Sequence, residues 1–241
     1  MSETKIFGNI KAVYFDYDNT LVEFDSVSQK ALIEVAKDMF DYITENYPKL
    51  NVSLEELTST LFSVTKSLDE EGVFDRKEWW LKTLERFEVK PSNEELYSWT
   101  QLYWSIAGKN ESYTDAIDAI EYLKAKGYKV GLITNSDGEG GDKKARISRF
   151  PLISKFDVII IGGEGNISPK PNPQPFLLAC EKLGLKVSEC VMVGDDPVKD
   201  CLAAKKAGMK AILVDRAQKV KHAELYADYV ISSLSTLSEI F

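Results

Sequence analysis

The chain has 241 residues, of which 44% are hydrophobic and 28% are charged, and its formal net charge is −8. This is the composition of a globular protein, and the length allows one large domain or one domain with an insertion, so disorder and fibrous repeats are excluded. An acidic chain lacks the broad positive field that attracts nucleic acid or an anionic membrane. If the substrate is an anion, positive charge must be supplied locally, for example by a metal ion.

The amino-terminal stretch and the cysteines indicate the cellular compartment. The first eleven residues contain no sustained apolar run, so we expect no signal peptide. The aliphatic run at residues 158–161 is far too short to span a bilayer. The three cysteines, Cys180, Cys190 and Cys201, form no CxxC pair and are expected to be buried, reduced thiols. We therefore expect a soluble, cytoplasmic protein.

A strand is predicted over residues 11–15, apolar on both faces, as in a parallel sheet that helices cover on both sides. Similar apolar runs recur at 130–133, 158–161, 191–193, 211–214 and 229–231. Helical patterns lie between them at 114–126, 175–183 and 199–207. A glycine directly follows each of these patterns, and glycine favours the left-handed turn after a helix. The alternation predicts a Rossmann-like α/β core with three layers and a parallel sheet.

The stretch 22–112 interrupts this alternation. Its apolar residues follow helical spacing, for example at Leu32 and Val35, and it contains no strand pattern. We therefore predict an all-helical cap domain over 22–112, inserted into an α/β core domain that residues 1–21 and 113–241 form together.

Helix-capping patterns and tryptophans mark the insertion further. Ser53, Asp75 and Ser92 each have a glutamate three residues later, and the two serines fit the capping box most closely. All four tryptophans of the chain lie in this stretch, at Trp79, Trp80, Trp99 and Trp104. Packing within a helical bundle is the expected role of these rings, and lining a cleft is the alternative.

Polar groups of a consistent kind follow four of the predicted strands. In chain order they are Asp16 and Asp18, then Thr134 and Asn135, then Lys170, and finally Asp195, Asp196 and Asp200. In open α/β sheets, ligands bind at the carboxyl ends of the parallel strands. We therefore expect these groups to converge although they are far apart in the sequence.

The residue types suit chemistry on a phosphate ester. A carboxylate is ionised at neutral pH, so Asp16 can attack phosphorus without a separate base. Attack on an anion requires charge neutralisation, which Mg²⁺ held by Asp16 and Asp195 would supply, with Lys170 as a second positive centre. The Thr134 hydroxyl can bind phosphate oxygens, and Asp18 can protonate the leaving alkoxide.

The motifs DYDNTL (16–21), TNS (134–136), KPNP (170–173) and VMVGDD (191–196) occur in this order, each beside a predicted strand. Together they resemble the four motifs of the haloacid dehalogenase-like (HAD) superfamily, in its phosphatase branch. The α/β portion is similar to the core of that superfamily. The helical insertion resembles the C1-type cap of its first subclass, as in phosphoglycolate phosphatases.

The resemblance implies a role for each motif residue. Asp16 would be the catalytic nucleophile, Asp18 the general acid/base and Lys170 a catalytic cation. Thr134 and Asn135 would bind the phosphoryl group together with Lys170. The turn after the first strand carries Asn19 where the family often has glycine, and asparagine tolerates the left-handed conformation that such a turn requires.

The resemblance also implies a Mg²⁺ site. Its ligands would be the Asp16 carboxylate, the Asp18 backbone carbonyl and the Asp195 carboxylate. Three further residues would support these ligands from behind: Thr20, Asp196 and Asp200. Asp195 and Asp200 are separated by four residues where the family often has three. This departure leaves the separate roles of Asp196 and Asp200 open, and Asp196 is alternatively a direct metal contact.

Taken together, the motifs predict a Mg²⁺-dependent hydrolase of small phosphate monoesters that works through an aspartyl phosphate. The alternatives are a phosphomutase resembling β-phosphoglucomutase, a 2-haloacid dehalogenase, and a binding protein with a decayed site. Asp18 argues against the dehalogenase, because a halide leaves without a proton. The expected partner is a small phosphorylated metabolite, neither nucleic acid nor membrane, for a protein that is a monomer or a homodimer.

The glycine-rich run at residues 137–142 is the remaining motif. It lacks the GK[ST] ending of a P-loop, so we interpret it as a loop before a helix at 143–150.

Overall fold

The computed structural model describes residues 8–241, so the first seven residues of the predicted core segment lie outside the described residues. Two compact units are found. The α/β unit comprises the chain up to Glu23, Glu111–Ser136 and Lys144–Phe241. The helical unit comprises Phe24–Asn110 and also the glycine-rich loop Asp137–Lys143, which the sequence pattern had assigned to the α/β portion.

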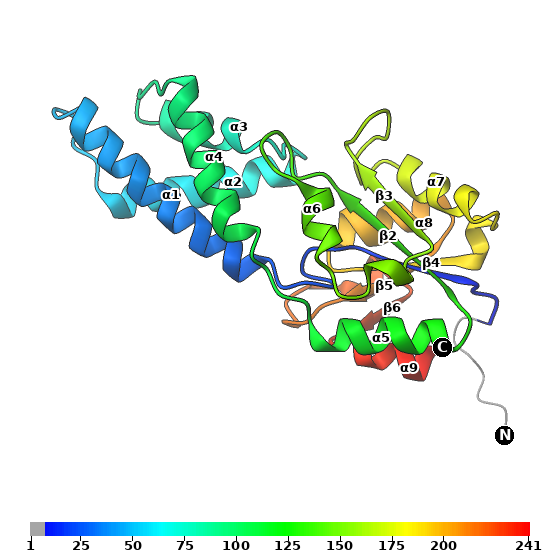
Figure 1. Cartoon of the computed structure of the whole chain (residues 1–241). Coiled ribbons are helices and arrows are strands. Elements are labelled where there is room, and N and C mark those ends of the chain that lie inside the picture. The colour runs from blue at the N-terminus through cyan, green and yellow to red at the C-terminus, as the bar shows by residue number, and fades with distance from the viewer. Residues whose placement is uncertain (1–7) are drawn as a thin grey trace. The chain divides into compact units, whose positions relative to one another are not determined.

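The α/β unit is built on a six-stranded sheet in the order β3-β2-β1-β4-β5-β6 (Figure 1). The strands are β1 (Ala12–Phe15), β2 (Lys129–Asn135), β3 (Val158–Gly162), β4 (Cys190–Gly194), β5 (Lys210–Val214) and β6 (Tyr229–Ile231). Every neighbouring pair is parallel, so the predicted α/β fold and all six predicted strands are confirmed.

Helices cover both faces of this sheet, which explains why its strands are apolar throughout. Val13 and Phe15 of β1 face the core cluster that involves α5 (Thr114–Ala125), α6 (Lys143–Ser148) and α9 (Leu237–Ile240). Ala12 and Tyr14 face the opposite cluster, with α7 (Gln174–Lys182) and α8 (Ala203–Ala207). The three cysteines are free and buried, as expected, in the second cluster.

Three helices end beside the glycines that the sequence pattern marked as helix ends, but one of these helices begins earlier than predicted and in a different conformation. Gly127, Gly184 and Gly208 all adopt positive φ angles, between 65° and 97°. The predicted helix at 199–207 instead starts at Pro197 as a π-helix, Pro197–Leu202, and becomes α-helical only at α8. The Asp196 carbonyl accepts from the amides of both Asp200 and Cys201 and so widens this first turn.

The helical unit contains α1 (Asp25–Asn46), α2 (Leu54–Glu70), α3 (Arg76–Glu85) and α4 (Asn93–Ala107). Ser53, Asp75 and Ser92 cap the last three of these helices, and Ser92 forms the complete capping box with Glu95. Trp79, Trp80 and Trp99 are buried in the core of this unit, so packing is confirmed as the role of these rings, whereas Trp104 is partly exposed.

Close packing accounts for the glycines of the loop Asp137–Lys143. A Cβ atom on Gly138 would lie 2.4 Å from the Phe74 carbonyl oxygen, and one on Gly140 would lie 2.6 Å from Thr100 Cγ2. Glu139 forms an ion pair with Lys77 of α3. The glycines therefore let this loop lie against the helical unit, which explains the run without a phosphate-binding role.

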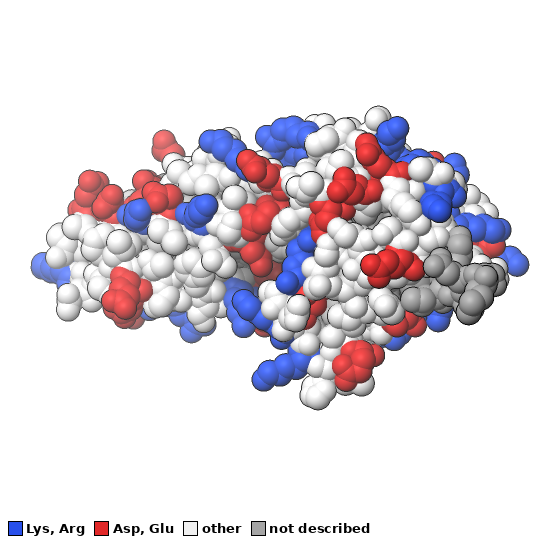
Figure 2. Space-filling model, turned by 90° about the horizontal axis from the view of Figure 1, so that it is seen from below, with Lys and Arg blue, Asp and Glu red and all other residues white. Residues whose placement is uncertain are grey.

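None of the described helices combines the length and apolarity needed to cross a membrane. On the face of the molecule drawn in Figure 2, acidic and basic side chains are interspersed, and the described residues form no broad basic area there. That face does not offer a continuous positive field of the kind that attracts nucleic acid.

Candidate active site

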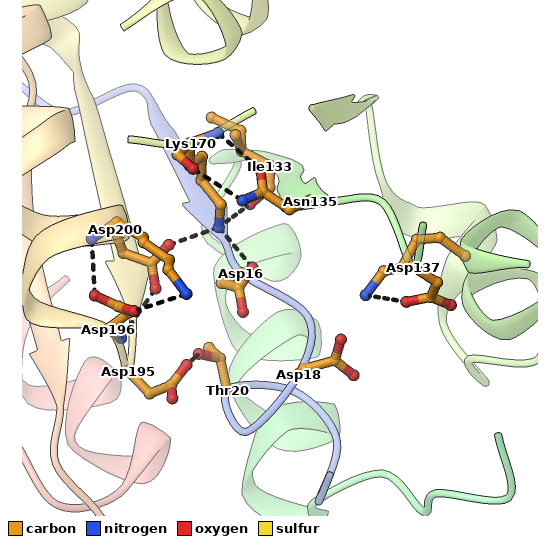
Figure 3. A network of polar contacts seen from close by, with 12 residues as sticks. Asp16, Asp18, Thr20, Ile133, Asn135, Asp137, Lys170, Asp195, Asp196 and Asp200 are labelled. Carbon is orange, nitrogen blue, oxygen red and sulfur yellow. Dashed lines mark hydrogen bonds and ion pairs between the residues drawn. The ribbon is translucent and has the colours of Figure 1, made fainter. Parts of the chain in front are cut away.

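Four of the residues predicted to converge lie together at the carboxyl ends of the strands (Figure 3): Asp16, Lys170, Asp195 and Asp200. Asp16 follows β1, which pairs with both β2 and β4 and so lies at the centre of the sheet. The Asp16 amide donates to the Val193 carbonyl at 3.0 Å and continues the pairing of β1 with β4 by one residue. The topology thus places Asp16 between the end of β2 and the acidic residues after β4.

Lys170 is the cationic centre of the site and is 3% exposed. Its ammonium donates to Asp16 Oδ1 and Asp200 Oδ1, both at 2.6 Å, and to the Ile133 carbonyl at 2.9 Å, so all three protons are bound. Burial opposes the charged form, but the negative charges of Asp16 and Asp200 outweigh it and raise the pKa of Lys170. The lysine therefore remains a fixed positive charge beside Asp16 at neutral pH.

Three carboxylates share this space. Asp16, Asp195 and Asp200 each bring an oxygen within 4.8 Å of the others. Burial and the charges of Asp16, Asp200 and Asp196 raise the pKa of Asp195. Burial also raises the pKa of Asp200 to about 7, against the lowering effect of Lys170. The site thus concentrates more negative charge than one lysine neutralises.

This donor set fits a hard divalent cation. Carboxylate oxygens are the ligands that Mg²⁺ prefers, and a cation would relieve the mutual repulsion that raises the Asp195 pKa. Asp200 also supports its neighbours: Oδ1 accepts from Lys170, and Oδ2 accepts from the Asp196 amide at 3.1 Å. A Cβ atom on Gly194 would meet Asp200 Oδ2 at 2.2 Å, so only glycine leaves room for this carboxylate.

The pKa directions predict that Mg²⁺ stabilises the protein more at about pH 8 than at about pH 5. Carboxyl groups with raised pKa values retain protons at low pH, and a metal must displace those protons to bind. At a hundred times the dissociation constant, binding adds about 2.7 kcal/mol of stability. Thermal unfolding with and without Mg²⁺ at both pH values measures the effect. Asp195→Asn should abolish most of the increase in melting temperature that Mg²⁺ causes. An increase equal to that of the wild type would contradict a role for Asp195 in holding the metal.

Thr20 connects the first motif to the fourth. Its hydroxyl donates to Asp195 Oδ1 at 3.1 Å, and its carbonyl accepts from Arg216 Nη2 at 3.0 Å. Arg216 also pairs with both oxygens of Asp115, at 2.8 and 3.0 Å. Burial alone would raise the pKa of Asp115, but hydrogen bonds from Arg216 and Ser233 lower it below its ordinary value. The Thr20 turn is thus held by an ion pair that the motifs did not reveal.

The remaining predicted residues have well-defined partners. Both polar atoms of the Asn135 amide bind the Lys170 backbone, at 2.8 and 3.0 Å, so this side chain fixes the turn that carries the lysine. The Asp196 carboxylate caps the π-helix by accepting from the amides of Val198 and Lys199. Thr134 is 2% exposed and lies in β2, directly before the last residue of the strand.

Asp18 turns away from the cluster of three carboxylates and pairs with Arg146 of α6 (Figure 3 shows the Asp18 side chain). The arginine is buried, whereas the Asp18 side chain is 20% exposed. Asn19, which follows Asp18, has φ 57°, the left-handed conformation expected for this turn. Nothing in the sequence pattern pointed to Arg146, because its partner lies 128 residues away.

Comparison with known proteins identifies the family. The model of the haloacid dehalogenase-like hydrolase family matches residues 10–208. PpaX of Clostridium perfringens is 30% identical over 205 residues, which cover 83% of this chain and 82% of the relative. The glyceraldehyde 3-phosphate phosphatase of Methanocaldococcus jannaschii is 27% identical and aligns over 96% of both chains.

Solved structures support the same assignment. A HAD phosphatase from Thermococcus onnurineus is 29% identical with a TM-score of 0.65, covering 96% of this chain and 97% of its own. A 2-haloacid dehalogenase from Pseudomonas syringae is 27% identical with the same TM-score and the same coverage. The chain therefore belongs to the haloacid dehalogenase-like hydrolase family, and the predicted resemblance is confirmed.

Proposed function

We propose that this hydrolase is a Mg²⁺-dependent phosphatase that transfers the phosphoryl group of a small monoester to Asp16 and then to water. The observation that carries the proposal is the ion-pair network in which Lys170 joins Asp16 to Asp200 beside Asp195. The relatives named as phosphatases support it. In a dehalogenation, by contrast, a carbon–halogen bond breaks and the second acid, Asp18, has no leaving-group proton to supply.

The residues divide the reaction into two displacements. In the first, an Asp16 oxygen forms a bond to phosphorus while the bond to the leaving alkoxide breaks, and Asp18 gives that alkoxide its proton. In the second, Asp18 takes a proton from water as the water oxygen attacks the same phosphorus, and the bond to Asp16 breaks. Inorganic phosphate is released and both aspartates return to their initial states.

Positive charge in the site serves both displacements. Lys170 neutralises charge beside the nucleophile, and the Thr134 hydroxyl can donate to a phosphoryl oxygen at the end of β2. Asp16, the Asp18 carbonyl and Asp195 would hold Mg²⁺, with Asp200 near enough to join them. When bound, the ion supplies charge neutralisation for the phosphoryl oxygens.

Asp18→Asn tests the proposed function, because the two substrate classes depend on Asp18 to different extents. The variant should lose about 10²-fold or more in kcat for an alkyl phosphate, whose leaving group needs a proton. The first displacement of an aryl phosphate should be affected far less, because a phenolate leaves without protonation. Single-turnover release of alcohol or phenol from the two esters measures this difference. Equal losses would mean that Asp18 is not mainly a proton donor.

A phosphomutase is the second function that these residues permit, because it too begins with phospho-Asp16. Incubation with a hexose 1-phosphate separates the two. Free phosphate indicates a hydrolase, whereas accumulation of the 6-phosphate indicates a mutase. We also propose that the substrate is a small phosphorylated metabolite, as the name of the 27% identical Methanocaldococcus jannaschii relative indicates for that protein. A panel of such esters would identify it.

A further inference from the structure

Arg146 holds Asp18 by a two-pronged ion pair. Its Nη1 donates to Asp18 Oδ2 at 3.3 Å, and its Nη2 donates to Asp18 Oδ1. A planar guanidinium that binds both oxygens fixes the plane of the carboxylate as well as its position. The arginine side chain is 3% exposed and therefore has little freedom to turn away.

The residue between the two aspartates fixes Arg146 in turn. The Tyr17 hydroxyl donates to the Arg146 carbonyl at 2.9 Å. The guanidinium carbon lies 5.6 Å from the centroid of the Tyr17 ring. That ring also packs edge-on against Phe150, at 6.2 Å between centroids. The first motif and α6 are thus joined through both the backbone and the side chain of Arg146.

We propose that Arg146 is a positioning residue, which fixes the place and the plane of the Asp18 carboxylate for its two proton transfers. The inference rests on the proposed function and extends it, because neither the motifs nor the reaction scheme requires an arginine in α6. A carboxylate that exchanges protons in both displacements must keep one orientation in both. The guanidinium fork supplies that constraint, whereas a lysine at the same place would supply the charge without the fork.

Arg146→Lys tests the inference through its dependence on the leaving group. We expect kcat for an alkyl phosphate to fall about 10- to 100-fold, because a small misplacement of a catalytic group is costly. The first displacement of an aryl phosphate should change less than about 3-fold, and KM should stay within about 2-fold. Arg149→Lys is the matched control, since this exposed arginine lies just beyond the end of α6. It should behave as the wild type with both esters.

A double-mutant cycle separates positioning from a structural role. In the Asp18→Asn background, Arg146→Lys should cause no further loss with the alkyl ester, because there is no longer an acid to position. Equal losses with both esters, additive losses in the cycle, or a raised KM at unchanged kcat would each overturn the inference. The last result would mean that Arg146 binds the substrate.

If Arg146→Lys does not fold, a milder variant tests the same inference. Tyr17→Phe removes the hydrogen bond to the Arg146 carbonyl and should reduce kcat for the alkyl ester about 3- to 10-fold, with less effect on the aryl ester. An unchanged preference between the esters in this variant would overturn the inference. A wild-type protein that cleaves neither ester would instead overturn the proposed function, and the inference would fall with it.

Discussion

Replacing Asp16 by asparagine is expected to reduce kcat for an aryl phosphate by at least about 10³-fold, because the amide is a poor nucleophile toward phosphorus. The variant should still fold. Asparagine has nearly the same shape, and its carbonyl oxygen can still accept from the Lys170 ammonium, which lies 2.6 Å from Asp16 Oδ1. A large loss of activity with a normal melting temperature would therefore report on chemistry and not on folding.

Asp157→Asn is the matched control for this experiment. Asp157 is also a partly buried carboxylate with lysine partners, Lys124 at 2.8 Å and Lys129 at 3.0 Å. It directly precedes β3, however, and so lies at the amino ends of the strands, opposite the site. The activity of Asp157→Asn should match that of the wild type. Turnover by Asp16→Asn comparable to that of this control would show that Asp16 is not the nucleophile.

The second large effect is expected for Lys170→Met, in both stability and activity. Methionine leaves Asp16 and Asp200 buried without their cation, and breaking a buried ion pair in this way costs about 3–5 kcal/mol. Loss of charge neutralisation beside the nucleophile should also reduce kcat by about 10²- to 10³-fold. Urea unfolding and steady-state kinetics measure the two effects separately.

The stability loss in Lys170→Met should depend on pH in a defined direction. In the wild type the pKa of Lys170 is raised, so the lysine is charged and its contribution is present below the ordinary lysine pKa of about 10.5. In the variant, buried carboxyls without a cation keep protons more tightly when folded. Their ionisation therefore destabilises the fold as the pH rises, and the loss should be larger at about pH 8 than at about pH 5.

Lys124→Met is the comparison for Lys170→Met, since it removes an ion pair with Asp157 whose lysine is 28% exposed. Exposed pairs contribute about 0–1 kcal/mol, so this variant should unfold close to the wild type at both pH values. If Lys170→Met lost no more stability than Lys124→Met, the network around Lys170 would not be the centre that we describe.

The sequence predicted those parts of the site that local patterns encode. An apolar strand followed by Asp16, or by Thr134, is visible in a few consecutive residues, and the parallel topology then brings such strand ends together. The same holds for the capped helices and for the glycines after α5, α7 and α8, whose signals lie within one turn.

The parts that were missed depend on contacts between distant segments. Arg146 reaches Asp18 across 128 residues, and Arg216 reaches the Thr20 carbonyl across 196. Nothing near either arginine distinguishes it from a surface charge. The π-helix is a similar case, because it arises where the Asp196 carbonyl accepts two amides while the Asp200 carboxylate binds Lys170 and the Asp196 amide.

Trapping the covalent intermediate tests the proposed mechanism most directly. Asp18→Asn lacks the base for the second displacement, so an aryl phosphate should leave it phosphorylated on Asp16. Borohydride reduces an acyl phosphate to an alcohol, and peptide mapping after acid quench and reduction would then locate it. We predict homoserine in place of Asp16, and none in Asp16→Asn. Reduction at another residue, or rapid release of phosphate with no reducible intermediate, would contradict nucleophilic attack by Asp16.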